Sequence, residues 1–156
     1  MQELGIEQNL EIKVIDKETE TRAENLIKRG LEEHFGTYDD SYNPDLKGII
    51  KNYIEQGHIF LVGVYQDQVI CTGALMEMDQ ETGQIARMSV AKEYRRNGLG
   101  SRMLTELEQR AKEKGYKKIV LGTNADWVNA RGLYESYGYQ LYNQDTESVH
   151  YKKILK

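Results

Sequence analysis

Residues 88–104 read MSVAKEYRRNGLGSRML, and the pattern of this segment changes from that of a strand to that of a helix. Its first residues continue a short apolar run that ends at Val90 and predicts a strand. From Leu99 onward, apolar side chains recur every three or four residues, the spacing that places them on one helical face. These side chains are Leu99, Met103, Leu104, Leu107 and Ala111. The segment therefore predicts a strand over 85–90, a loop, and a helix that ends near Gly115.

The loop between this strand and this helix has the residue types of an anion-binding site. The N-terminus of a helix leaves backbone N–H groups unpaired and carries a positive partial charge. Gly98 and Gly100 would let an anion approach the backbone closely, because no Cβ stands in the way. Four basic residues accompany them: Lys92, Arg95, Arg96 and Arg102. We expect the loop to hold a phosphate or a pyrophosphate.

Two common phosphate-binding motifs fit the loop poorly. The P-loop pattern GxxxxGK followed by Ser or Thr is absent. The dinucleotide pattern GxGxxG is met only by Gly98 and Gly100, because position 103 is methionine. An enzyme that binds NAD or ATP is therefore the weaker interpretation of this loop.

Outward from this loop, the elements alternate in a way that predicts one mixed sheet. Short turns join the strand at 85–90 to two apolar strands before it, which favours an antiparallel meander. A helix and then a strand follow the loop, which favours a parallel crossover. The predicted strands are 10–14, 59–65, 69–78, 85–90, 119–123, 139–142 and 149–155, and the predicted helices are 19–36, 44–57, 99–114 and 130–137. The fold class is α/β: a mixed, mostly antiparallel central sheet of about seven strands, with helices on both faces.

Length and composition limit the kind of protein. With 156 residues we expect one domain over 1–156, with residues 1–9 frayed. A net charge of −4 argues against nucleic-acid binding through general electrostatic attraction. No apolar run is long enough to cross a membrane. The single cysteine, Cys71, and the absence of a secretory signal predict a cytoplasmic location. The three histidines show no metal-ligand spacing, so we expect no metal site.

Two motifs together resemble one family. Arg95, Gly98 and Gly100 form the pattern Arg-x-x-Gly-x-Gly, which resembles the coenzyme A pyrophosphate loop of the GCN5-related N-acetyltransferase (GNAT) family. Residues 129–139, NARGLYESYGY, are similar to the late helix of that family. The resemblance covers residues 10–156 and is strongest over 85–140. It implies the GNAT fold and acetyl-CoA as the co-substrate.

The resemblance also assigns cofactor contacts residue by residue. The backbone of Met88 and Val90 would bind the pantetheine arm, and the Met88 N–H would polarise the thioester carbonyl as an oxyanion donor. Trp127 stands where the family often has asparagine, so Asn124 or Asn129 would supply that contact. The implied pyrophosphate-binding residues are Arg95, Arg96, Asn97, Gly98, Leu99, Gly100 and Ser101.

The same resemblance suggests how protons move. Tyr134 would be the general acid that protonates the departing thiolate. In several members a glutamate on the strand before the loop accepts the proton of the amine, but here that position is Gln84, which cannot act as a base. Glu77 is our favoured substitute by position. The other candidates are Asp79, Glu81, Glu33, His34 and His58, and water could also remove the proton.

The expected function is transfer of an acetyl group from acetyl-CoA to a primary amine, by direct attack in a ternary complex. The amine would belong to a small molecule or a peptide, and the resemblance suggests a homodimer formed through C-terminal strands. A non-catalytic acyl-CoA-binding or sensing module is the alternative, because Gln84 replaces the usual base. Arg87, a charge in the middle of a strand, is expected either to reach into a wet cleft or to pair with an acid.

Overall fold

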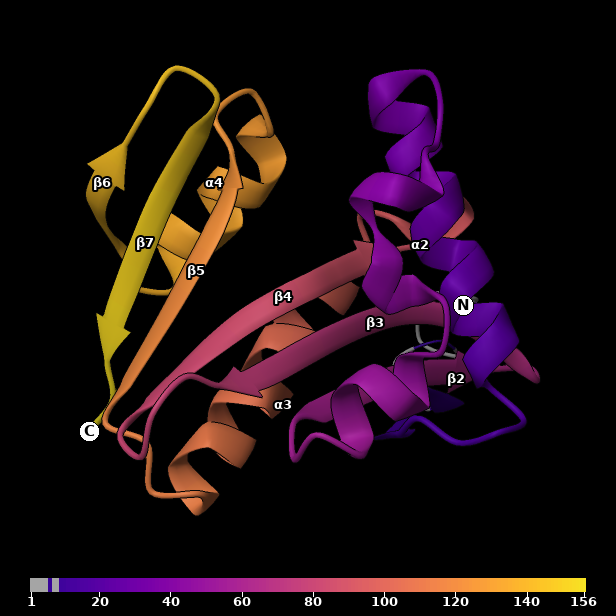
Figure 1. Cartoon of the computed structure of the whole chain (residues 1–156), viewed down its shortest axis with the longest axis horizontal. Coiled ribbons are helices and arrows are strands. Elements are labelled where there is room, and N and C mark those ends of the chain that lie inside the picture. The colour runs from indigo at the N-terminus through magenta and orange to yellow at the C-terminus, as the bar shows by residue number, and fades with distance from the viewer. Residues whose placement is uncertain (1–5, 7–8) are drawn as a thin grey trace.

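The computed structural model, which describes Ile6 and residues 9–156, contains one seven-stranded sheet in the order β1-β2-β3-β4-β5-β7-β6 (Figure 1). The strands are β1 (Glu11–Val14), β2 (Ile59–Tyr65), β3 (Gln68–Glu77), β4 (Thr82–Val90), β5 (Lys118–Asn124), β6 (Gln140–Gln144) and β7 (Ser148–Ile154). Only β4 and β5 run parallel, and every other pairing is antiparallel. The predicted fold class is confirmed.

Strands β2, β3 and β4 form the predicted antiparallel meander. Gln66 and Asp67, which join β2 to β3, both have positive φ angles (50° and 62°). Two such residues in succession match the twist of a two-residue hairpin turn. Strand β1 pairs with the other edge of β2. Leu10, Ile12 and Val14 alternate with charged residues, which predicts that Val14 points inward. This prediction is wrong, because Val14 is 42% exposed and the next residue, Ile15, is 4% exposed.

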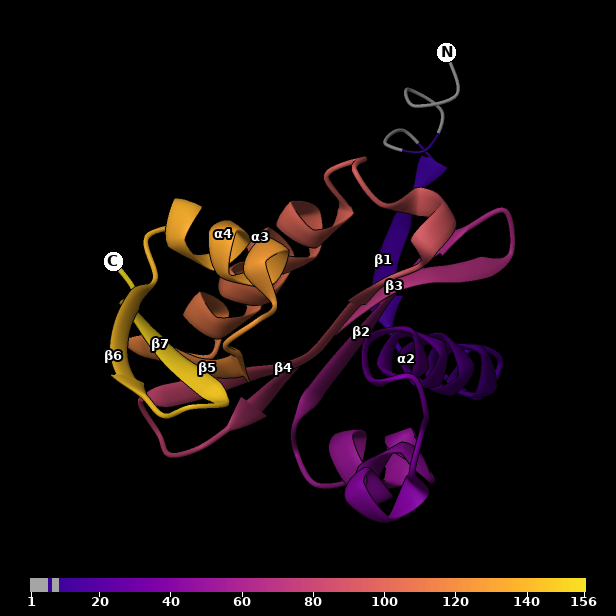
Figure 2. The ribbon, with the colours of Figure 1, turned by 90° about the horizontal axis from the view of Figure 1, so that it is seen from above.

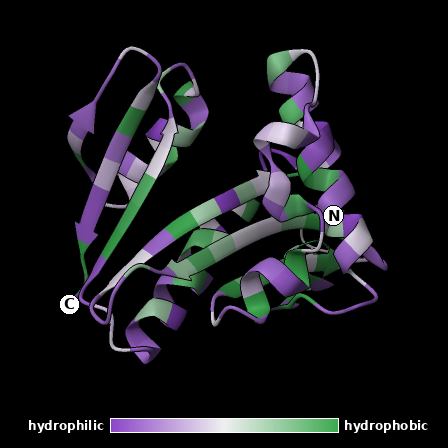
Figure 3. Cartoon of the chain, viewed as in Figure 1, coloured by the Kyte–Doolittle hydropathy of each residue, from purple (hydrophilic) through white to green (hydrophobic). Residues whose placement is uncertain are grey.

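Helices cover both faces of the sheet (Figure 2). On one face lie α3 (Leu99–Glu113) and α4 (Val128–Ser136), and on the other lies α2 (Glu20–Phe35) with the short turns that follow it. The predicted apolar face of α3 is buried, and this helix packs on β3 and β4. Strand β5 contains a run of hydrophobic residues, whereas β6 at the edge of the sheet is mostly hydrophilic (Figure 3). The core therefore lies between the central strands and their helices.

The predicted helix over 44–57 is wrong, because the segment forms short turns. Pro44–Leu46 is a 3₁₀ turn and Ile50–Ile54 is a π-helical turn. Gly48, with a φ of 104°, lies between them in a conformation that no α-helix contains. Leu46, Ile49 and Tyr53 are nevertheless buried, as the apolar spacing predicted.

The predicted ends of the other helices agree with the structure to within two residues; the largest difference is that α4 begins at Val128 instead of residue 130. Thr19 is the N-cap of α2, and Gly36 ends this helix with a φ of 79°. Of the segment expected to be frayed, residues 1–5 and 7–8 lie outside the described part of the chain. None of the helices within that part is long and apolar enough to span a membrane.

Candidate active site

The sheet splits between β4 and β5, and this split defines the candidate site. The two strands pair only from Thr82↔Lys118 to Ile85↔Leu121. Beyond that level they diverge and form the V seen in Figure 1, while the other edge of β5 stays paired with β7 as far as Asn124. The facing edges of 86–90 and 122–124 therefore lack the backbone pairing that a continuous sheet would supply.

A β-bulge lies in β4 just beyond the last pair. Ala86 pairs with Ala74 and Ser89 pairs with Thr72, so two residues of β4 oppose one residue of β3. The first of the two, Arg87, has a φ of 53°, which is strained for a residue with a long side chain. The Thr72 hydroxyl donates to the Arg87 carbonyl at 2.8 Å. This bond holds the bulge where the strands part.

The Arg87 side chain makes an ion pair, as one of the two expectations for it stated, and Arg87 also lines a cavity, as the other stated. Its Nη2 lies 2.7 Å from Asp45 Oδ1 and its Nε donates to Asp45 Oδ2 at 2.9 Å. The Tyr53 hydroxyl donates to the same carboxylate at 2.6 Å, and Asn43 Oδ1 accepts from Arg87 at 3.1 Å. Burial by itself would raise the pKa of Asp45, but the hydrogen bonds from Arg87 and Tyr53 outweigh it and lower the pKa. The carboxylate is therefore charged at neutral pH.

The loop after β4 presents a concave row of backbone amides. Arg96 and Gly98 have φ angles of 68° and 75°, and Gly98 is the N-cap of α3. Residues that alternate between left-handed and other conformations turn successive N–H groups toward one point. Within the described part of the chain, the N–H groups of residues 96–101 donate to no acceptor. This arrangement can hold an anion.

The side chains of this loop have different tasks. Arg95 donates to Glu33 Oε1 at 3.1 Å and to the Val90 carbonyl at 3.1 Å, so it ties the loop to α2 and β4. The Asn97 amide donates to the carbonyls of Tyr94 and Arg95. The exposed Arg96 side chain has no partner among the residues that the structure describes, so it is available to an anion.

Tyr134 lies on α4 behind the split, packed between two other tyrosines. Its ring centroid is 5.9 Å from that of Tyr139 and 6.3 Å from that of Tyr151. It is 6% exposed, and burial raises the pKa of its phenol to about 12. Tyr151 anchors the helix, because its hydroxyl donates to Glu135 at 2.5 Å. Tyr134 is thus a protonated phenol at neutral pH.

The turn from β5 to α4 holds the two candidate asparagines and an aromatic contact that the sequence did not predict. Asn124 ends β5, and Asn129 lies in the first turn of α4. Between them, the Trp127 ring lies 4.6 Å from the ring of His34, near the end of α2. His34 Nε2 also lies 3.5 Å from Asp126 Oδ1. These contacts connect the two arms of the V across its open end.

Glu77 lies at the closed end of the split. It pairs with Gly83, at a level where β4 and β5 are still joined, and its carboxylate accepts from the Tyr116 hydroxyl at 2.9 Å. Its backbone N–H donates to His58 Nδ1 at 3.0 Å. Asp79 and Glu81 lie farther along the same turn. The structure therefore keeps this acidic group apart from the residues beyond the split.

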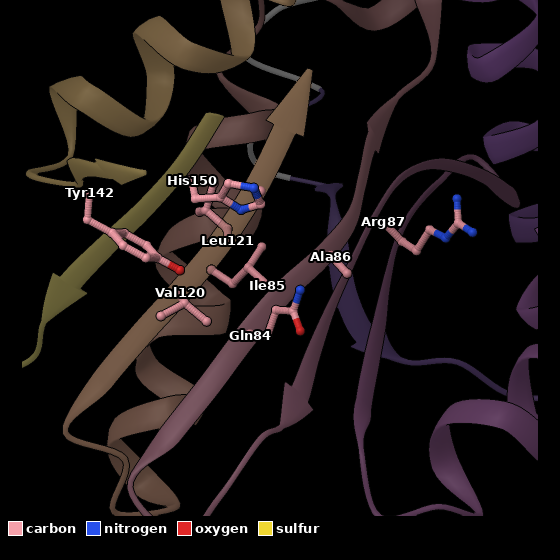
Figure 4. A pocket seen from close by; sticks show the side chains of 9 residues that line it. Gln84, Ile85, Ala86, Arg87, Val120, Leu121, Tyr142 and His150 are labelled. Atoms are coloured by element: carbon pink, nitrogen blue, oxygen red, sulfur yellow. The ribbon is translucent and has the colours of Figure 1, made fainter. Parts of the chain in front are cut away.

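A cavity of about 290 Å³ lies where β4 and β5 begin to part, and Figure 4 shows its walls. One wall comes from Gln84 to Arg87, and the other from Val120 to Gly122 with Tyr142 of β6 and His150 of β7. His150 and Tyr142 were not expected in the site, because neither belongs to a sequence motif. One sequence feature could have indicated this wall. Gly122 is a glycine inside a strand, and such a glycine often marks a place where a ligand or another part of the chain approaches the backbone closely.

Two further observations limit the chemistry. The Cys71 side chain is fully buried, and burial raises the pKa of its thiol to about 12, so it is not a nucleophile at neutral pH. No group of three or more metal-ligating side chains comes together in the described ranges. The site offers backbone amides, a buried phenol and an imidazole.

Comparisons with known proteins agree with this geometry. Residues 22–139 match the profile of the Acetyltransferase (GNAT) family. The chain is 38% identical over 101 residues to "Probable N-acetyltransferase 14" of Xenopus tropicalis, covering 64% of this chain and 49% of that protein. It is 33% identical over 97 residues to the uncharacterized N-acetyltransferase YsnE of Bacillus subtilis, covering 57% of this chain and 64% of that one. The chain thus spans about half to two thirds of the length of these curated relatives.

Solved structures share the whole architecture. A GNAT-family acetyltransferase from Staphylococcus aureus Mu50 superposes with a TM-score of 0.85 at 22% identity, covering 94% of this chain and 99% of that one. The PaiA N-acetyltransferase of Thermoplasma acidophilum, solved in complex with coenzyme A, gives a TM-score of 0.82 at 17% identity, with the same coverage. At these identities the likeness is one of fold.

Proposed function

The chain belongs to the GNAT family of acetyltransferases, and on that basis we propose that it transfers an acetyl group from acetyl-CoA to a primary amine. The observation that carries the proposal is the row of N–H groups over 96–101, which have no acceptor among the described residues. A pyrophosphate satisfies such groups and also gains from the positive end of α3. The coenzyme A complex of the PaiA neighbour supports this choice of ligand.

We assign the cofactor contacts as the family resemblance implies. The amides of 96–101 would hold the pyrophosphate, with Arg96 as the free cation beside them and Arg95 as the residue that fixes the loop. The unpaired edges at Met88 and Val90 on β4 would take the pantetheine arm, and Asn124 or Asn129 would contact it from the other side. Bound acetyl-CoA supplies the activated acetyl group.

The proposed chemistry is direct attack of the amine on the thioester. The Met88 N–H, beside the bulge, would donate to the carbonyl oxygen as negative charge develops there, a contribution often worth about 3 kcal/mol. Tyr134 would give its proton to the departing sulfur. An acetyl-cysteine intermediate is disfavoured because Cys71 is buried and protonated.

The acceptor would enter through the cavity at the split. A volume of about 290 Å³ is at the lower end of ligand pockets, which favours a small amine or the end of a peptide side chain. The Arg87 charge is already neutralised by Asp45, so the cavity offers no free cation for an acidic acceptor. We retain a homodimer through the C-terminal strands and a cytoplasmic location as parts of the proposal.

One alternative has an observation in its favour. Gln84 stands where family members often carry the general base, so the chain could bind acyl-CoA without transferring the acyl group. Glu77, the substitute proposed from sequence, remains untested in this role. Its bond to Tyr116 at the closed end of the split argues for a structural task.

Titration calorimetry and a turnover assay test the proposal together. The purified chain is titrated with acetyl-CoA, with NAD and ATP as controls, and then assayed with putrescine, kanamycin, alanine and a lysine-containing peptide. We expect selective binding of acetyl-CoA and release of free thiol with at least one amine. Binding without turnover would favour the sensing module, and loss of selectivity for acetyl-CoA would refute the assignment of the loop.

A further inference from the structure

We propose that His150, on β7, is the general base that takes the proton of the attacking amine. The inference rests on the proposed acetyl transfer and identifies the residue that fills the role left open by Gln84. It follows from where β7 places the imidazole relative to the split between β4 and β5.

The register of the sheet puts His150 at the level where the split begins. The last pair between β4 and β5 is Ile85↔Leu121, and His150 pairs with the next residue of β5, Gly122. A Cβ on Gly122 would lie 3.0 Å from His150 Nδ1 and 3.2 Å from Cε1. The imidazole therefore lies against the backbone of β5, in the space that a side chain at 122 would fill. Figure 4 shows the ring beside the cavity, across from Gln84.

Strand alternation places the proposed base and the proposed acid on opposite faces of the sheet. Successive residues of a strand point to opposite sides. Tyr151 follows His150 and faces α4, where its ring lies 6.3 Å from that of Tyr134. His150 therefore faces the cavity side, from which the amine would arrive, and Tyr134 lies behind the split, where the sulfur would leave.

The imidazole is free to accept a proton, unlike the other candidates. Neither of its ring nitrogens has a hydrogen bond or ion pair among the described residues, and Tyr142 is its aromatic neighbour at 6.3 Å. The other titratable and charged groups near it are Asp145 in the β6–β7 turn, Arg87 across the cavity, and Lys152, two residues along β7, whose Nζ lies 5.8 Å from the centroid of the Tyr142 ring. The candidates named from the sequence each have a partner: Glu77 has Tyr116, Glu33 has Arg95, Glu81 has Lys117, Asp79 has the Glu81 N–H, His58 has the Glu77 N–H, and His34 has Asp126.

The proposed step balances with the groups present. An ammonium first loses one proton to solvent, and the nitrogen lone pair of the neutral amine then forms the C–N bond with the thioester carbon. Once this bond has formed, the nitrogen of the former amine carries one proton too many, and a ring nitrogen of His150 takes it. The C–S bond breaks with its electron pair on sulfur, which takes the proton of Tyr134. Solvent carries the imidazolium proton back to the phenolate, so one amine and one thioester give one amide and one thiol.

The test compares His150→Gln with His58→Gln, the same change at a histidine outside the cavity. We expect His150→Gln to lower kcat about 100-fold or more, because general base catalysis commonly contributes 10²–10⁴. Its affinity for acetyl-CoA by calorimetry should stay within about twofold of wild type. His58→Gln should retain the wild-type kcat. Each assay uses the amine of the four-member panel that wild type acetylates fastest.

A second variant separates the position of the ring from its chemistry. Gly122→Ala keeps the imidazole but places a methyl group 3.0 Å from Nδ1, so the ring must shift by a few tenths of an ångström. We expect a folded protein by circular dichroism, with unchanged acetyl-CoA affinity and a kcat reduced at least tenfold. Full turnover by His150→Gln would overturn the assignment of His150 and leave the acetyl transfer standing. Absence of wild-type turnover with all four amines would overturn both.

Discussion

Arg87 Nη2 lies 2.7 Å from Asp45 Oδ1, which joins the bulge of β4 to a turn 42 residues earlier in the chain. The Arg87 and Asp45 side chains are 19% and 28% exposed, so the ion pair is partly shielded from water. It holds a residue whose φ of 53° is unfavourable in isolation. The pair therefore stabilises the backbone geometry of the bulge, which contains the Met88 N–H proposed as the oxyanion donor.

We expect Asp45→Asn to lower the free energy of unfolding by about 2 kcal/mol, because it leaves the Arg87 charge without its partner. Urea denaturation at pH 7 measures this change. Glu106→Gln, which removes the carboxylate of a more exposed ion pair with Arg110, is the matched control and should cost less than about 0.5 kcal/mol.

The pH dependence of this loss follows from the lowered pKa of Asp45. A carboxyl whose pKa is lowered by folding stabilises the protein above its unfolded pKa, about 3.9, and loses that contribution as the pH falls through the folded value. The difference between wild type and Asp45→Asn should therefore be full at pH 7 and shrink below about pH 4. A difference independent of pH would mean that the charge of Asp45 contributes nothing.

Gly100→Glu should abolish binding of acetyl-CoA, because it places a carboxylate among the amides proposed to hold the pyrophosphate. A Cβ at Gly100 would lie 3.2 Å from Leu133 Cδ2, so some of the effect could be steric. Gly100→Ala adds that Cβ without the charge and should weaken binding by less than about tenfold. Calorimetry measures both, and equal losses in the two variants would show that steric contact with α4, not charge, decides the result.

Arg96→Gln should weaken binding of acetyl-CoA more than Arg95→Gln does. The Arg96 side chain is exposed and without a partner in the described part of the chain, whereas Arg95 is held by Glu33 and the Val90 carbonyl. We expect about a tenfold loss for Arg96→Gln at low salt, and a smaller loss at 0.5 M NaCl because salt screens exposed charges. A larger loss for Arg95→Gln would show that loop order matters more than the free cation.

Glu77→Gln tests the base that the sequence favoured. Because the carboxylate accepts from Tyr116 where β4 and β5 are still paired, we expect kcat to stay within about twofold of wild type. Glutamine keeps an oxygen that can accept the same bond, so folding should be unaffected. A loss of 100-fold or more in the same amine assay would instead establish Glu77 as the base.

The parts of the fold that depend on local pattern could be predicted from the sequence. The spacing of apolar residues over Leu99–Glu113 is enough to predict helix α3 and its buried face. The two residues between β2 and β3 are enough to predict a hairpin turn. The segment around Gly48 could not be predicted in this way. Its buried residues have helical spacing, but one glycine at a φ of 104° divides it into turns, and packing on the sheet chooses that arrangement.

The residues of the candidate site also differ in whether local sequence alone could indicate them. The loop over 95–101 could be proposed as an anion site from the sequence, because glycines, arginines and a helix start lie together there. His150, the proposed base, could not be selected in this way, because it approaches the split only through the register of β7 on β5 and the missing Cβ of Gly122. Arg87 was singled out as a charge within a strand, but the sequence offered no means to select Asp45 as its partner.

Tyr134→Phe should lower kcat by about 10²–10³ and leave the affinity for acetyl-CoA unchanged, because it removes the proposed proton donor but keeps the ring. Burial raises the pKa of this phenol to about 12, so it stays protonated between pH 6 and pH 10, and the ratio of wild-type to variant kcat should be constant over that range. Tyr139→Phe is the matched control: it loses a hydrogen bond to Glu108 at 2.8 Å and about 1 kcal/mol of stability, but no step in the transfer. Thiol release measured from pH 6 to pH 10 with all three proteins decides the matter. A ratio that falls toward one above pH 8 would show that Tyr134 ionises there, and equal rates throughout would remove it as the acid.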